Sequence, residues 1–145
     1  MALAFESPGY RDPGFYPAQI YSIALGGGMS SRLFQEIREK RGLCYTIFAQ
    51  SGAYSDTGMT TIYAGTGGSE IADLAGLTID EMKRAAEDMT EAEIDRARAQ
   101  MKAGLLMGLE SPSARAERMA RMIQIWGYVP AIEETVQRIE AVTPA

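Results

Sequence analysis

The residues with the clearest potential for chemistry are an arginine and a tyrosine seven positions apart, Arg38 and Tyr45. A helix is expected to end near Arg38, Gly42 to make a tight turn, and a strand to begin at Tyr45, so both side chains should lie at one rim of a sheet. A guanidinium and a phenol together offer several hydrogen-bond donors, which suit a peptide carbonyl or a developing oxyanion. On spacing alone a structural role is favoured instead, in which Arg38 complements the helix dipole and Tyr45 packs in the core.

Several common catalytic centres are excluded by composition. The sequence contains no histidine and one cysteine, so it provides neither imidazole metal ligands nor a Ser-His-Asp triad. Cys44 has no histidine partner and is expected to be a small buried hydrophobe, not a nucleophile. Carboxylates such as Glu36 and Glu93 lie in expected helices, where solvent exposure is the default. We therefore predict no catalytic residue and no metal site within this chain.

Length and charge limit the remaining classes. The chain has 145 residues, 46% of them hydrophobic, and a net charge of −5, which fits one globular domain over residues 1–145. Two cationic stretches, 32–41 and 115–121, are interleaved with glutamate and apolar residues, so we expect solvated helix faces and no nucleic-acid binding. No apolar run approaches the roughly 18 residues of a membrane span. We expect a soluble protein of unknown compartment, cytoplasmic or periplasmic if it is bacterial.

Both ends of the chain look cut. Ala2–Phe5 is strand-like directly after Met1, and Thr143–Ala145 looks like the start of a helix with no helix following. The ends therefore indicate a truncated segment of a longer protein, with a naturally short protein as the alternative. Truncation leaves an edge strand and a helix without their partners, so we also expect the fragment to self-associate or to expose an apolar patch.

The expected elements place Arg38 and Tyr45 in an α+β domain. Strands are expected at 2–5, 44–53 and 58–65, with turn residues at 54–57 joining the last two as an antiparallel hairpin. Six helices are expected: one capped by Asp12 with Pro13 at its first position, then 31–40, 69–88, one opened by a Thr90/Glu93 capping box, one from Ser111-Pro112 to Gly127, and one from Pro130. Because helices do not separate every strand, a parallel array is excluded. We predict a two-layer domain with a mostly antiparallel sheet and helices on one face.

A glycine triplet, Gly26–Gly28, separates the first two expected helices. It lacks the spacing of a phosphate-binding loop, and no strand leads into it. As an isolated motif it favours a plain helix–helix turn.

The longer segment Leu25–Tyr45, LGGGMSSRLFQEIREKRGLCY, adds a resemblance. Together with Ser55–Gly58 and Ile62–Thr66 it resembles the second, non-metal half of pitrilysin-type and mitochondrial-processing-peptidase-type zinc peptidases, the inverzincins. The likeness is strong over Leu25–Thr66 and looser afterwards, through Thr90–Arg98, Leu109–Ser111 and Trp126–Gly127. Such proteins pair two homologous α+β halves around a chamber, and the zinc lies on an H-x-x-E-H motif of the other half. This chain lacks that motif.

The resemblance assigns expected roles to the residues singled out above. Arg38 and Tyr45 match the arginine and tyrosine that reach the substrate backbone near the zinc. Gly26–Gly28 lies where such proteins have a longer glycine-rich loop linked to substrate handling. The resemblance implies the same position for this shorter loop, but not the same role. The implied function is the substrate-binding half of a zinc metallopeptidase, with a peptide substrate and a homologous zinc-carrying half-domain or subunit as partner. The alternative is a non-catalytic assembly subunit of the same fold.

Overall fold

The structure, a computed structural model, describes residues 1–144 and contains a three-stranded antiparallel sheet. The strands are β1 (Ala2–Ser7), β2 (Thr46–Ala53) and β3 (Gly58–Gly65), in the order β1-β3-β2. The helices are α1 (Phe15–Gly26), the short η1 (Phe34–Glu39), α2 (Ile71–Asp88), α3 (Glu91–Gly108), α4 (Pro112–Trp126) and α5 (Ile132–Glu140). The predicted α+β class and the β2–β3 hairpin are confirmed.

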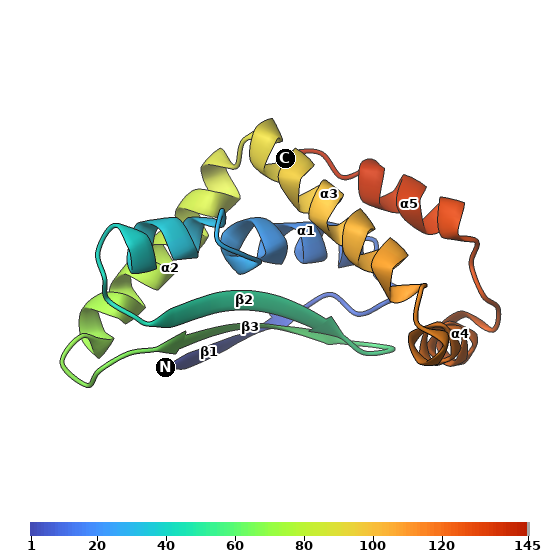
Figure 1. The fold of residues 1–145 in the computed structure, drawn as a ribbon, viewed down its shortest axis with the longest axis horizontal. Coiled ribbons are helices and arrows are strands. Elements are labelled where there is room, and N and C mark those ends of the chain that lie inside the picture. Colours follow the sequence, from blue (N-terminus) through green and yellow to red (C-terminus); the bar gives the residue numbers. More distant parts are fainter. Residues whose placement is uncertain (145) are drawn as a thin grey trace.

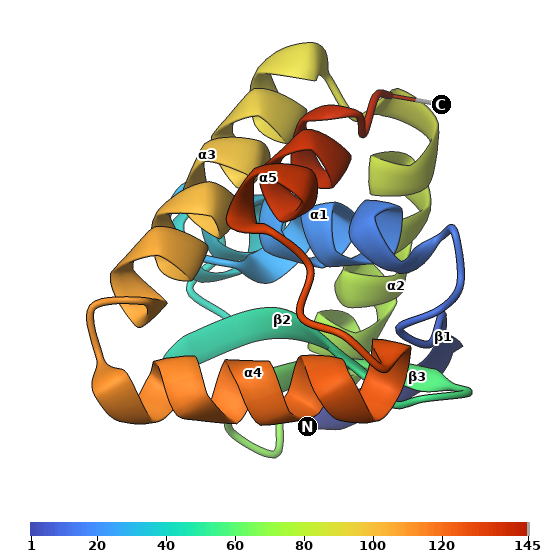
Figure 2. The same ribbon diagram turned by 90° about the vertical axis from the view of Figure 1, so that its right-hand side faces the viewer.

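The helices cover one face of the sheet, and this helical part is two helices deep. α1 lies directly on the sheet, and α3 and α5 lie over α1 on its far side (Figure 1). Figure 2 gives the same order from the side and shows α4 running past the hairpin end of the sheet. The opposite face of the sheet carries no described helix in either view.

The position of α1 explains its sequence, which is apolar around most of its circumference. Leu25 belongs to the core between α1 and the sheet, where it packs with residues such as Ile62. Ile20 and Ala24 belong to a second core, shared with Ile94 of α3 and other residues of α3 and α5. A helix between two apolar surfaces gains from burying both sides, and α1 therefore needs no polar stripe.

Alternation along the strands decides which side chains face the helices. Ile47 and Ala64 are buried toward the helices, whereas Phe48 and Tyr63 lie opposite each other on the helix-free face. Their rings are stacked with centroids 5.4 Å apart. Phe48 is 39% exposed and Tyr63 43% exposed, so this aromatic pair lies on a largely uncovered surface.

Several helix ends follow local sequence signals, but the starts of α1 and α5 do not. Thr90 and Glu93 form the predicted capping box of α3, and Gly127 ends α4 in the left-handed conformation with φ of 80°. The prediction that α1 begins at Pro13 is wrong, because α1 begins at Phe15. The Asp12 side chain instead accepts a hydrogen bond from the backbone N–H of Gly14 at 2.7 Å, in a turn that precedes the helix. The helix expected to begin at Pro130 begins instead at Ile132, after Ala131, whose side chain makes no capping hydrogen bond.

No helix within residues 1–144 is both long enough and apolar enough to cross a membrane.

Candidate functional site

Arg38 and Tyr45 are positioned by a helix end and a one-glycine turn, as predicted. The helix η1 is wider than an α-helix, since the N–H of Lys40 donates to the carbonyl of Gln35, five residues back, at 3.0 Å. Gly42 follows with a φ of 63°, a left-handed conformation that glycine adopts without steric cost. This turn directs the chain from η1 into β2 and brings Tyr45 beside the last turn of η1.

The contact between Arg38 and Tyr45 runs through the backbone. Arg38 Nε donates to the carbonyl oxygen of Tyr45 at 2.7 Å. The same guanidinium pairs with Glu39 at 2.8 Å and lies over the Phe34 ring, 4.5 Å from its centroid. The Tyr45 N–H donates to the carbonyl of Gly65 at 2.9 Å, which ties this residue to the end of β3. Arg38 is therefore held on three sides, and Tyr45 is held by its main chain.

The Tyr45 side chain projects into solvent, because 86% of the residue is exposed. The part of the structural alternative in which Tyr45 packs in the core is therefore wrong, whereas Arg38 does lie in the last turn of η1, as that alternative expects. The Arg38 side chain is 33% exposed, so part of the guanidinium also reaches the surface. An exposed phenol and a partly exposed guanidinium at one rim form a small donor site.

Cys44, next to this rim, has no role in the donor site. It is 8% exposed and belongs to the core between the sheet and the helices. Burial raises the pKa of its thiol, with a smaller opposing effect of Arg38, so the unreactive thiol form is favoured. The prediction of a small buried hydrophobe is confirmed.

The glycine triplet makes the predicted helix–helix turn, and its three members differ in their packing. A Cβ on Gly26 would lie 2.4 Å from the backbone nitrogen of Ala49, so Gly26 allows α1 to approach β2 closely. Gly27 accepts a hydrogen bond from the Gln100 side chain of α3 at 2.6 Å. A Cβ on Gly28 would meet nothing nearer than 3.9 Å. The triplet is thus packed between β2 and α3 at its first two positions and open at the third.

An ion-pair cluster beside the glycine loop was not predicted. Arg32 Nε and a terminal nitrogen contact both carboxylate oxygens of Glu93, at 2.6 and 2.8 Å, and Arg32 also pairs with Asp88. The Arg32 side chain is 13% exposed and that of Glu93 is 16% exposed, so the expectation that Glu93 is solvent-exposed is wrong. Hydrogen bonding to Arg32 lowers the pKa of Glu93 to about 2. The partners lie 61 residues apart, and no local sequence signal links them.

A catalytic zinc does not fit the donor atoms of this chain. Zinc sites of peptidases use at least three protein ligands drawn from histidine, cysteine and carboxylates, and here histidine is absent from the sequence. Within the described residues, no three carboxylate or cysteine side chains are grouped so that they could hold a metal ion.

Comparison with known proteins gives consistent similarities. A family described as "Peptidase M16 inactive domain" matches residues 1–101. A protein of Streptomyces coelicolor named an uncharacterized zinc protease is 39% identical over 126 residues, which cover 86% of this chain and 28% of that protein. A Mycobacterium tuberculosis protein with the same description is 37% identical over 144 residues, which cover 99% of this chain and 33% of that protein.

The fold is also found in a solved structure. The crystal structure of a protease from Helicobacter pylori matches with a TM-score of 0.85 at 22% sequence identity, covering 98% of this chain and 35% of that one. The chain spans about a third of the length of the curated relatives it matches.

Proposed function

The chain belongs to the peptidase M16 family as its inactive domain, and on this premise we propose that it is the substrate-binding half of a zinc metallopeptidase that hydrolyses peptide bonds. The family resemblance predicted from the sequence of Leu25–Thr66 is confirmed. The relatives named zinc proteases support a zinc enzyme, and because the described residues of this chain offer no zinc ligand set, we assign the metal to another part of that enzyme. In this proposal zinc and the general base come from a homologous half, in the same polypeptide or in a second subunit.

The observation that carries the proposal is the exposed, anchored Tyr45 beside Arg38. Large aromatic side chains are usually buried in part, whereas Tyr45 is 86% exposed on a main chain fixed by Arg38 and by the carbonyl of Gly65. A fixed main chain with a projecting phenol holds the hydroxyl where a ligand can reach it. This arrangement supports a role in binding and gives no packing reason for a tyrosine at this position.

In the proposed role, both side chains donate hydrogen bonds to the peptide. The Tyr45 hydroxyl donates to the carbonyl oxygen of the bond to be cleaved and keeps donating as negative charge develops on it. The exposed part of the Arg38 guanidinium holds a neighbouring carbonyl and so fixes the register of the substrate. Because Arg38 is already held by Glu39 and the Phe34 ring, little rearrangement accompanies binding. Donors of this kind contribute about 2.7–4 kcal/mol to the transition state.

The test uses the complete enzyme, with this chain joined to its zinc-carrying half, and measures kcat/KM on a set of unstructured peptides. Tyr45→Phe keeps the ring and removes the hydroxyl, and we expect kcat/KM to fall about a hundredfold with an unchanged melting temperature. Arg38→Lys keeps the charge and loses the planar donor fork, so a smaller loss is expected. Tyr128→Phe and Arg41→Lys are the matched controls, because both residues are exposed and lie outside the proposed contacts.

Two results would contradict the proposal. Full activity of Tyr45→Phe on several peptides would remove its role as a donor. An assembled, zinc-loaded protein that cleaves none of the peptides would favour the alternative of a non-catalytic assembly subunit with the same fold.

A further inference from the structure

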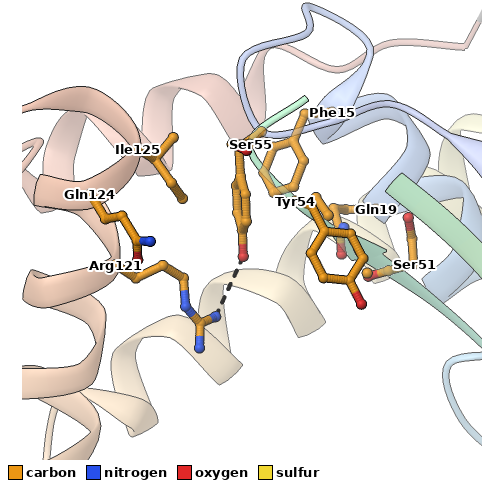
Figure 3. Close-up of a pocket in the computed structure, with 11 residues that line it drawn as sticks. Phe15, Gln19, Ser51, Tyr54, Ser55, Arg121, Gln124 and Ile125 are labelled. Atoms are coloured by element: carbon orange, nitrogen blue, oxygen red, sulfur yellow. Dashed lines mark hydrogen bonds between the residues drawn. The ribbon is translucent and has the colours of Figure 1, made fainter. Parts of the chain in front are cut away.

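A pocket of about 710 Å³ lies at the far end of the β2–β3 hairpin from Arg38 and Tyr45, between the hairpin, α1 and α4 (Figure 3). Its volume falls within the roughly 300–1,000 Å³ that is typical of small-ligand sites. Neither the donor site at Tyr45 nor the glycine loop contributes to its lining. The lining residues are Tyr10, Phe15, Gln19, Ser51, Gly52, Ala53, Tyr54, Ser55, Arg121, Gln124 and Ile125.

One side of this pocket is apolar. The rings of Tyr10 and Phe15 lie with their centroids 5.0 Å apart, and Ile125 of α4 is 5% exposed beside them. Tyr54, at the hairpin turn, is 62% exposed and lies across the pocket from Ile125 and Gln124 of α4 (Figure 3). An aromatic or aliphatic side chain entering here would exchange water for these surfaces.

The pocket contains one ionised side chain among its lining residues, that of Arg121. The chain as a whole has 19 acidic and 14 basic residues, yet no carboxylate lines this pocket. Arg121 extends from α4 toward the Tyr10 hydroxyl, with the nitrogen–oxygen distance at 3.4 Å (Figure 3). A second nitrogen pairs with Glu117 at 2.5 Å, one turn earlier in α4, and the Glu117 side chain is 69% exposed.

These contacts leave Arg121 available for an anion. A hydrogen bond of 3.4 Å to a neutral hydroxyl is weak, and an exposed ion pair along a helix stabilises little. A carboxylate can instead accept two parallel hydrogen bonds from one guanidinium, which is a stronger and more specific arrangement.

The other polar groups of the lining can hydrogen-bond a peptide amide of the ligand, next to its carboxylate. Gln124 and the Ser55 hydroxyl are neutral groups on opposite walls that can both donate and accept hydrogen bonds. Gln19 already donates to the carbonyl of Ser51 at 3.0 Å, so this part of the wall is fixed. One cation, neutral donors and acceptors, and an apolar surface together match the carboxyl-terminal residue of a peptide.

We propose that this pocket binds the carboxyl-terminal residue of a peptide, with its carboxylate on Arg121 and its apolar side chain against Tyr10, Phe15 and Ile125. The inference is independent of the donor site at Tyr45, since it concerns the other end of the hairpin and involves no bond cleavage. A peptide end held here would be a second point of attachment for a bound chain.

The test is calorimetric titration of the 145-residue chain with acetyl-Ala-Ala-Phe, once as the free acid and once as the carboxyl-terminal amide. We expect saturable binding of the acid and at least tenfold weaker binding of the amide, because the amide carries no charge for Arg121. A third titrant, 3-phenylpropionate, carries the same ring and carboxylate without a peptide and should bind at least tenfold more weakly than the peptide acid.

Variants locate the binding. Arg121→Gln should weaken binding of the acid at least tenfold, and Lys83→Gln, which removes an equal charge from the exposed side of α2, should leave it unchanged. Glu117→Gln removes the competing carboxylate and should bind the acid at least as tightly as the unaltered chain. Circular dichroism of each variant checks that the fold is retained.

Several results would contradict the binding of a peptide carboxyl terminus in this pocket. Equal binding of acid and amide, unchanged binding by Arg121→Gln, or no binding of the acid at all would overturn the proposal, and the acid–amide comparison needs no variant. Equal binding of 3-phenylpropionate would assign the pocket to small organic acids and overturn the peptide assignment. Neither result would alter the expected effect of Tyr45→Phe on turnover.

Discussion

At the scale of single residues, Gly26 is a position where even a methyl side chain has no room. A Cβ there would lie 2.4 Å from the backbone nitrogen of Ala49, and backbone cannot move aside as a flexible side chain can. We predict that Gly26→Ala lowers the free energy of unfolding by about 1–3 kcal/mol, through a forced separation of α1 from β2. Urea unfolding followed by circular dichroism measures the change.

The neighbouring glycine provides the control. Gly28→Ala adds the same methyl group where nothing lies nearer than 3.9 Å, so we expect a change within about 0.5 kcal/mol. Equal effects at Gly26 and Gly28 would show that the triplet acts through chain flexibility and not through contact with β2.

At the scale of elements, the pair of Arg32 and Glu93 joins the chain after the glycine loop to the first turn of α3. The pKa of Glu93 is lowered from 4.5 to about 2 in the folded chain. A lowered carboxyl pKa stabilises the folded state above the unfolded value, and this contribution is lost as pH falls from about 4.5 toward 2. We predict that Glu93→Gln destabilises the protein by roughly 1.5–3 kcal/mol at pH 7 and by much less near pH 2.

Unfolding in urea at several pH values tests this prediction. Glutamine keeps one oxygen that can accept from the Thr90 N–H at the cap, but it loses the charge together with one of the two oxygens that accept from Arg32. Glu91→Gln is the control in the same helical turn, because the Glu91 side chain is 57% exposed and its ion pair with Arg98 is therefore partly solvated. A Glu93→Gln difference that stays constant from pH 7 to pH 2 would contradict an ionic origin.

Features of the elements that depend on nearby residues could be predicted from the sequence, whereas those that depend on packing could not. Thr90 with Glu93, Gly42 and Gly127 act within a few residues of themselves, and each was predicted from local sequence. The proximity of Arg38 and Tyr45 was predictable for the same reason, since a short turn separates them. The ion pair of Glu93 was not, because Arg32 reaches it only after α1, the sheet and α2 have packed together. The start of α1 was missed because the Asp12 side chain stabilises a turn in which the helix has not yet begun.

For the candidate site, the exposure of the Tyr45 side chain is what the sequence could not predict. Spacing placed it at the rim of the sheet, but the direction of its ring depends on which way Gly42 sends the chain into β2. The pocket around Arg121 could not be predicted from the sequence, because it is lined by residues of α1, the hairpin and α4, which are distant in the sequence.

At the scale of the whole molecule, the helix-free face of the sheet supports the expected self-association. Phe48 and Tyr63 form a stacked pair there, and Met59 on the same face is 46% exposed. A second copy that covers this face with its own would bury both aromatic pairs. We predict a concentration-dependent dimer in sedimentation velocity, weakened at least severalfold by Tyr63→Gln.

Thr61→Gln is the matched control, since Thr61 lies two residues before Tyr63 on the same face and strand and is not aromatic. Sedimentation as a monomer at all concentrations, or equal effects of the two variants, would contradict the prediction.

The attachment of α4 has a consequence for how the molecule opens. Ile125 is the buried residue of this helix, and polar contacts such as the Arg11 side chain on the Ile125 carbonyl hold it to the rest. Few buried contacts mean a low free energy of local opening, so backbone amides of α4 should exchange with deuterium well before those of β3, at the centre of the sheet. Exchange measured by mass spectrometry would test this, and equal rates in α4 and β3 would contradict it. Because α4 forms one wall of the pocket, a bound peptide end should slow exchange in α4 and leave β3 unchanged, so exchange in α4 would report occupancy of the pocket.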